Sequence, residues 1–106
     1  VMQPTCEGRL PYLYLKPGKE EAVRQYFEHA WPGQFSLLTR QQVLDSGLLG
    51  RGTPHIDLEN RIGDLVAIPH GKAYLWWVDK PNVMQGRHGG LHPDEMLVPL
   101  YALSLD

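Results

Sequence analysis

The chain has 106 residues, of which 42% are hydrophobic and 21% are charged, and its formal net charge is -2. This length and apolar content suit one compact domain with a continuous core. The nearly balanced charge provides no general attraction for nucleic acid or for an anionic membrane surface. No apolar run approaches the ~20 residues of a membrane-spanning helix, and the first residues do not form a signal peptide.

Cys6 is the single cysteine, so no disulfide can form within the chain and a reduced, cytoplasmic setting is expected. Nothing near Cys6 in the sequence supplies a base that would activate its thiol, and we assign it no catalytic role. Val1 as the first residue leads us to expect a cut from a longer protein.

The first predicted elements are a strand at residues 10–16 and a helix at residues 19–31. The strand is aromatic and aliphatic, and Pro11 restricts it to a strand start or a sheet edge. In the helix, apolar residues recur at spacings of one, three and four, which places them on one stripe. These residues are Ala22, Val23, Tyr26, Phe27, Ala30 and Trp31.

Residues 34–38 predict a second strand, and residues 40–46 a short helix with Thr39 as its N-cap and Gly47 at its end. The order strand, helix, strand favours a crossover in which the two strands are parallel. Residues 47–60 are rich in glycine and predict a loop.

Residues 64–68 and 73–78 are apolar runs that predict a hairpin, and residues 79–93 predict a long loop. Pro93 followed by two acids indicates a single helical turn, and residues 96–105 predict a final strand. Together these elements predict one α+β domain. We expect a small mixed sheet of four or five strands with two helices on one face.

The segment from Gly86 to Leu100 has the most chemical content, and it reads Gly-Arg-His-Gly-Gly-Leu-His-Pro-Asp-Glu-Met-Leu-Val-Pro-Leu. His88 lies beside small residues in a loop before an apolar segment, a position suited to a metal ligand. Arg87 beside it could contact a phosphate. From residue types alone, His88 and Arg87 are equally compatible with solvent-exposed loop residues that have no function.

This segment resembles the type I phosphodiesterase and nucleotide pyrophosphatase-like members of the alkaline phosphatase superfamily. They carry a His-Gly-Gly-Leu-(Ser or His)-Pro-(Glu or Asp)-Glu-Met-Leu-Val-Pro-Leu run near the C-terminus. Residues 61–68 also resemble the family segment that leads into this run. The likeness is long and specific over residues 61–103 and looser over residues 8–60. It implies a C-terminal subdomain with a cap-like part at residues 8–78 and a metal-ligand loop with a final strand at residues 79–106.

The resemblance implies a two-metal phosphoesterase that hydrolyses phosphodiester or pyrophosphate bonds. His88 would be one ligand of a pair of zinc or other divalent ions, and Arg87 would be a substrate contact. In the family the nucleophile and the other ligands lie upstream of the matched region, and this chain has no Asp-His-Gly motif. We therefore expect no catalytic residue here, no tightly bound metal and no activity of the chain alone.

The expected partners are an N-terminal catalytic domain of the same protein and, for that whole protein, a nucleotide or another phosphorylated small molecule. No membrane partner is expected. The alternative is a non-catalytic module for substrate selection or self-association, in which the His-Gly loop is idle.

The other histidines favour structural or surface roles. His92 lies four residues after His88, but the two glycines between them oppose a helix. A cap for the turn that begins at Pro93 is therefore preferred over a second ligand. His55 and His70 lie in loops and are interpreted as surface residues.

Asp94 and Glu95 are interpreted as acids at a helix start, because adjacent side chains point apart and the helix dipole favours acids there. Trp76 and Trp77 would face opposite sides of a strand, so one ring is expected in the core and the other against a missing domain or a substrate. The apolar residues 96–105 are expected to face that missing domain. The exposed surface could then support dimerisation.

Overall fold

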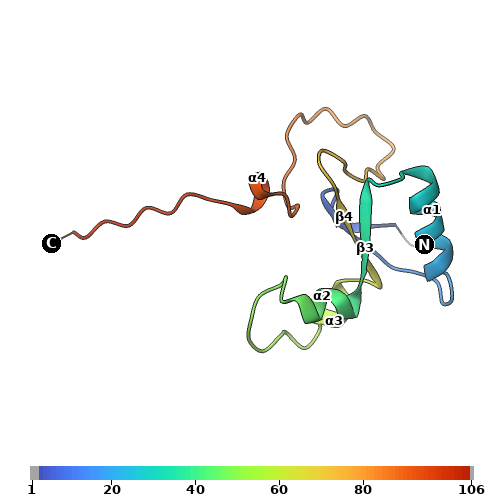
Figure 1. The fold of residues 1–106 in the computed structure, drawn as a ribbon, viewed down its shortest axis with the longest axis horizontal. Coiled ribbons are helices and arrows are strands. Elements are labelled where there is room, and N and C mark those ends of the chain that lie inside the picture. The colour runs from blue at the N-terminus through green and yellow to red at the C-terminus, as the bar shows by residue number, and fades with distance from the viewer. Residues whose placement is uncertain (1–2, 106) are drawn as a thin grey trace.

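A computed structural model describes residues 3–105 (Figure 1). The elements are β1 (Thr5–Glu7), β2 (Leu10–Leu13), α1 (Glu20–Ala30), β3 (Phe35–Thr39), α2 (Arg40–Ser46), α3 (Leu58–Arg61), β4 (Leu65–Pro69) and α4 (Pro93–Met96). They confirm the predicted α+β class. None of the helices in residues 3–105 combines the length and the apolar character that crossing a membrane requires.

The four strands form one sheet in the order β1-β2-β4-β3. Central β4 is antiparallel to both neighbours, and Val66 pairs with Tyr12 of β2 and with Leu38 of β3. Strands β2 and β3 therefore run parallel to each other, as the crossover predicts, but β4 lies between them. Every neighbouring pair is antiparallel, so the sheet is antiparallel and not mixed.

The predicted hairpin between residues 64–68 and 73–78 does not form. Both edges of β4 are already paired with β2 and β3, so β4 has no free edge for the segment that follows it. Residues 73–77 instead run without regular structure, and the Leu75 N–H donates to the Gly8 carbonyl at 2.8 Å.

The predicted final strand at residues 96–105 is also wrong. Beyond Met96 the chain extends away from the body and meets no sheet edge (Figure 1). Its apolar side chains are exposed, with Leu100 at 92% and Leu105 at 90%. We call residues 97–105 the tail.

The two longer helices cover opposite faces of the sheet, which corrects the expectation that both lie on one face. Phe27 of α1 packs in a cluster with Leu65 and Ala67 of β4. Val43 of α2 packs in a second cluster with Val66. Successive strand residues point to opposite faces, so β4 supplies the centre of both clusters.

Helix α2 begins and ends as predicted. The Thr39 hydroxyl accepts a hydrogen bond from the Gln42 N–H at 3.2 Å, and the Gln42 side chain accepts one from the Thr39 N–H at 2.9 Å. This reciprocal pair is a capping box. Gly47 ends the helix in the left-handed conformation, with φ 72°.

Candidate functional site

The candidate site is the loop around His88 together with α4. Gly89 has a φ of 84°, a left-handed conformation that favours glycine, and Gly90 is buried. The His88 side chain is exposed. Within residues 3–105 its ring has no hydrogen-bond partner, so the imidazole is available to a group outside the described chain.

A buried ion pair holds this loop against the body. Arg9 lies between β1 and β2 and is 5% exposed, and its side chain forms a bidentate pair with Glu95 of α4. Arg9 Nε is 3.0 Å from Glu95 Oε1, and Arg9 Nη2 is 2.6 Å from Glu95 Oε2. Two parallel charge-assisted hydrogen bonds fix orientation as well as distance.

The same two side chains also contact the backbone on either side of the loop. Arg9 Nη1 donates to the Gly71 carbonyl at 2.9 Å and to the Ala73 carbonyl. Glu95 Oε1 accepts from the Gly90 N–H at 3.2 Å. The pair therefore joins three parts of the chain: the β1–β2 turn, the turn after β4 and the His88 loop.

These contacts lower the pKa of Glu95 from 4.5 to about 2. The hydrogen bond from Arg9 is the largest cause, and the Gly90 N–H adds to it, while burial opposes both by disfavouring the charged carboxylate. The hydrogen bond to Glu95 raises the pKa of Arg9 above its ordinary value. Both groups are charged at neutral pH, and neither is free for acid–base chemistry.

This pair does not follow from the local sequence. Glu95 after Pro93 predicts only an acid at a helix start, and the residues around Arg9 predict no role for it. The available signal was a charged residue directly before the apolar strand at Leu10, because a charged side chain beside a core needs a partner. That signal does not identify the partner.

His92 caps α4, as predicted. Its Nδ1 accepts from the Asp94 N–H at 3.2 Å, and Pro93 occupies the first turn. The Asp94 carboxylate is 3.5 Å from the same nitrogen. The ring therefore serves the helix start.

Arg87 lies against two aromatic rings. Its guanidinium carbon is 4.3 Å from the centroid of Tyr74 and 5.3 Å from that of Trp76, distances at which the ring faces attract a cation. Arg87 and Lys72 border a hollow of about 670 Å³. This position suits contact with an anion, and the phosphate contact of Arg87 stays a prediction.

The remaining histidines lie elsewhere. His70 Nε2 is 2.7 Å from the Ser36 hydroxyl, and His55 Nδ1 accepts from the Asp57 N–H at 3.1 Å. Both side chains are exposed, which agrees with their interpretation as surface residues.

The residues of this loop do not by themselves fit a metal ion. In the part of the chain that the structure describes, no three His, Cys, Asp or Glu side chains converge in a way that could hold one. A catalytic zinc ion takes about three protein ligands. Glu95 is bound to Arg9, and the Nδ1 of His92 caps α4, so neither group joins His88 in a cluster of three ligands.

No protein-family model, curated protein or solved structure matches this chain.

Proposed function

We propose that this chain is the C-terminal part of a two-metal phosphoesterase that hydrolyses phosphodiester or pyrophosphate bonds. The observation that carries the proposal is the run from Gly86 to Leu100, which resembles the metal-ligand motif of type I phosphodiesterases and nucleotide pyrophosphatases. In this proposal His88 supplies one ligand to a zinc or other divalent metal pair. The chain contributes no nucleophile and is inactive alone.

The geometry of the loop supports this role. His88 is exposed and unbonded within residues 3–105, while the Arg9–Glu95 pair holds the backbone two residues away at Gly90. A metal ligand needs both an accessible nitrogen and a backbone that is fixed in position.

The proposed partner is an N-terminal catalytic domain of the same protein, which supplies the remaining ligands and the nucleophile. The exposed tail is an argument for such a partner domain, because six of its large apolar side chains are at least 76% exposed. Apolar surface of this extent is typical of an interface. The substrate would be a nucleotide or another phosphorylated small molecule, and Arg87 would contact it. The single thiol, Cys6, is consistent with a cytoplasmic setting.

The alternative function is a non-catalytic module for substrate selection or self-association. The exposed tail also favours this reading, since the same apolar side chains could bind a second copy. In that case His88 would have no chemical role.

The test compares the longer protein, its His88→Ala form, a His55→Ala control and the 106-residue chain. Metal content is measured by mass spectrometry, and turnover is measured with a chromogenic phosphodiester. We expect His88→Ala to weaken one metal and to lower turnover more than about 100-fold, since losing even a second-shell partner of a metal costs 10–100-fold. His55→Ala should match the unchanged protein.

Two outcomes would contradict the proposal. One is a His88→Ala protein that keeps its full metal content and activity. The other is hydrolysis of the diester by the 106-residue chain alone. A longer protein with neither metal nor activity would favour the non-catalytic alternative.

A further inference from the structure

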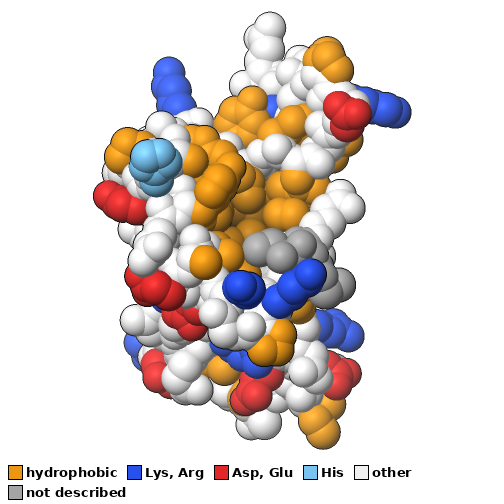
Figure 2. All heavy atoms as spheres, turned by 90° about the vertical axis from the view of Figure 1, so that its right-hand side faces the viewer, with side chains coloured by type: hydrophobic (Ala, Val, Ile, Leu, Met, Phe, Trp, Pro, Cys, Tyr) orange, Lys and Arg blue, Asp and Glu red, His pale blue; other side chains and the backbone are white. Residues whose placement is uncertain are grey.

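A groove lies on the face of the sheet that carries α1. Figure 2 shows this face, where hydrophobic side chains gather in a hollow with basic side chains beside it. The groove has a volume of about 390 Å³, and its walls include Leu13, Val23, Phe27 and Leu75. None of its lining residues belongs to the His88 loop or to the tail.

The position of α1 explains why the groove exists. Arg24 of α1 donates to the Leu37 carbonyl of β3 at 2.9 Å, and the rings of Phe27 and Phe35 are 5.3 Å apart, edge to face. These contacts hold α1 toward β3. The apolar stripe of α1 is wider than the surface it covers there, and Tyr26 remains 60% exposed where it lines the groove.

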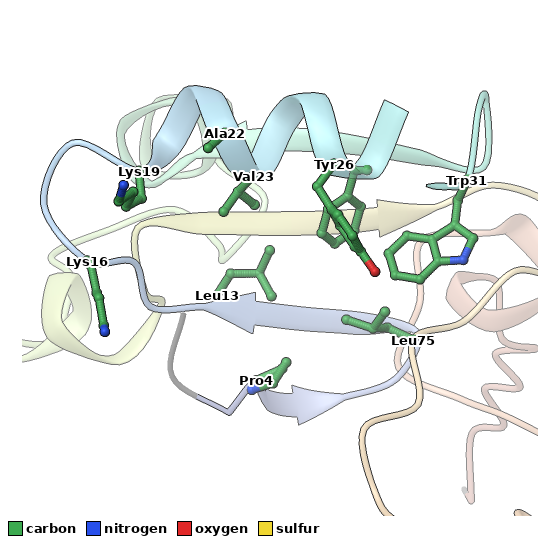
Figure 3. A pocket seen from close by; sticks show the side chains of 10 residues that line it. Pro4, Leu13, Lys16, Lys19, Ala22, Val23, Tyr26, Trp31 and Leu75 are labelled. Atoms are coloured by element: carbon green, nitrogen blue, oxygen red, sulfur yellow. The ribbon is translucent and has the colours of Figure 1, made fainter. Parts of the chain in front are cut away.

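The two ends of the groove differ in charge. Lys16 and Lys19 lie at one end, and Trp31 and Leu75 lie at the other (Figure 3). Neither lysine forms an ion pair within residues 3–105. Of the acids in the first turn of α1, Glu20 forms an ion pair with Arg24, and Glu21 accepts a hydrogen bond from Gln25. The end with the lysines therefore favours an anion.

The interior of the groove favours hydrocarbon over a peptide. Apart from the two ammonium groups, the Tyr26 hydroxyl and the Trp31 indole N–H are the polar groups among its lining side chains. A peptide would bring backbone N–H and C=O groups that need hydrogen-bond partners, and burying them without partners is costly. Small-molecule sites of about 300–1,000 Å³ are typically apolar with a few placed polar groups, and this groove lies within that range.

We propose that this groove binds an amphiphilic anion: a small molecule with an apolar chain or aryl body and one carboxylate, sulfonate or phosphate head. The body lies along Leu13, Val23 and Phe27. The head lies between Lys16 and Lys19. This site is separate from the proposed metal site and does not depend on it.

The test uses the 106-residue chain and the fluorescent sulfonate 1-anilinonaphthalene-8-sulfonate, which reports on apolar sites. The probe is displaced by decanoate and, in parallel, by decanol, each below the concentration at which it self-associates. The two competitors share one chain length and differ in charge. We expect decanoate to displace the probe at a lower concentration than decanol, by a factor of up to about five. An exposed ion pair contributes up to ~1 kcal/mol, which corresponds to that factor.

Variants separate the two parts of the site. A Lys16→Gln/Lys19→Gln protein should lose the preference for decanoate while still binding decanol. Ala22→Phe places a ring on the exposed face of α1 that lines the groove, and it should weaken both competitors. An Arg51→Gln/Lys80→Gln protein removes two positive charges away from the groove and should behave like the unchanged chain.

The proposal is overturned if decanol and decanoate compete equally, or if the double lysine variant keeps the preference for decanoate. It is also overturned if Ala22→Phe leaves binding of both unchanged while circular dichroism shows an intact fold. Displacement of the probe by a synthetic peptide of residues 96–106, with none by decanoate, would assign the groove to the tail of a second copy instead.

Discussion

Gly90 lies directly against the carboxylate of Glu95. A β-carbon at residue 90 would be 2.6 Å from Glu95 Oε2 and 2.8 Å from Oε1, distances that real β-carbons do not reach. The Gly90 N–H also donates to that carboxylate. A side chain at this position would have to push Glu95 away from Arg9.

We therefore expect Gly90→Ala to lower the free energy of unfolding by about 1–3 kcal/mol, the usual cost of overpacking. The matched control is Gly86→Ala, because a β-carbon at residue 86 in the same loop meets nothing within 4 Å. Urea denaturation of both variants measures the difference. Equal stability of the two variants would show that the contact with Glu95 is not tight.

The Arg9–Glu95 pair should make the free energy of unfolding depend on pH in the acidic range. The pKa of Glu95 is about 2 in the folded chain against an ordinary value of 4.5, so the stabilisation is complete above about pH 4.5. It is lost as the pH falls toward 2, because the unfolded chain binds the proton more readily. The difference between the two pKa values sets an upper limit of about 3 kcal/mol on this contribution, and solvent screening lowers it.

Glu95→Gln should remove this part of the pH dependence, and Glu28→Gln, an exposed position on α1, should retain it. The measurement is the free energy of unfolding from urea titrations between pH 6 and pH 2.5. If Glu95→Gln and the unchanged chain lose stability in parallel, the ion pair is not the source.

The capping box of α2 predicts a graded series at residue 39. Thr39→Ala removes the side-chain oxygen that accepts from Gln42 N–H and should cost about 1 kcal/mol. Thr39→Ser keeps that oxygen and should restore most of the loss. Thermal unfolding of the series measures this order, with Thr53→Ala in the exposed loop as the control. A Ser variant as unstable as the Ala variant would assign the effect to β3 packing.

Removal of residues 97–106 should leave the body intact. The tail side chains Leu100 and Tyr101 are 92% and 90% exposed, so they contribute little to the core. We expect the free energy of unfolding to change by less than about 0.5 kcal/mol, as for other surface changes. Sedimentation should show less self-association. A marked loss of stability would mean that the tail packs on the body in solution.

The elements set by local signals could be predicted from the sequence. Apolar spacing and first-turn acids mark α1, Thr39 and Gly47 mark α2, and Pro93 marks α4. In each case, residues within one or two turns of the helix end carry the information. The role of His92 as a cap was predictable for the same reason.

The strand pairing could not be predicted in the same way. Residues 73–78 and 96–105 have the composition of strands, but a strand also needs a free edge, and edges are decided by segments far away in sequence. Because β4 lies between β2 and β3, it has no free edge with which residues 73–78 could pair. Helices α1 and α2 pack on opposite faces of the resulting sheet. The link from Arg9 to Glu95 spans 86 residues and is equally invisible to local patterns.

The central place of β4 also orders the events of folding. Strands β2 and β3 are not hydrogen-bonded to each other, so a chain synthesised only as far as α2 lacks the strand that joins its two halves into one sheet. When β4 (residues 65–69) pairs with both β2 and β3, it completes the two hydrophobic clusters on the two faces of the sheet together. Pairing β2 with β4 closes the chain between Leu13 and Leu65, and closing a long loop costs entropy before its contacts form. Assembly of this domain on the ribosome must therefore wait until β4 has left the exit tunnel.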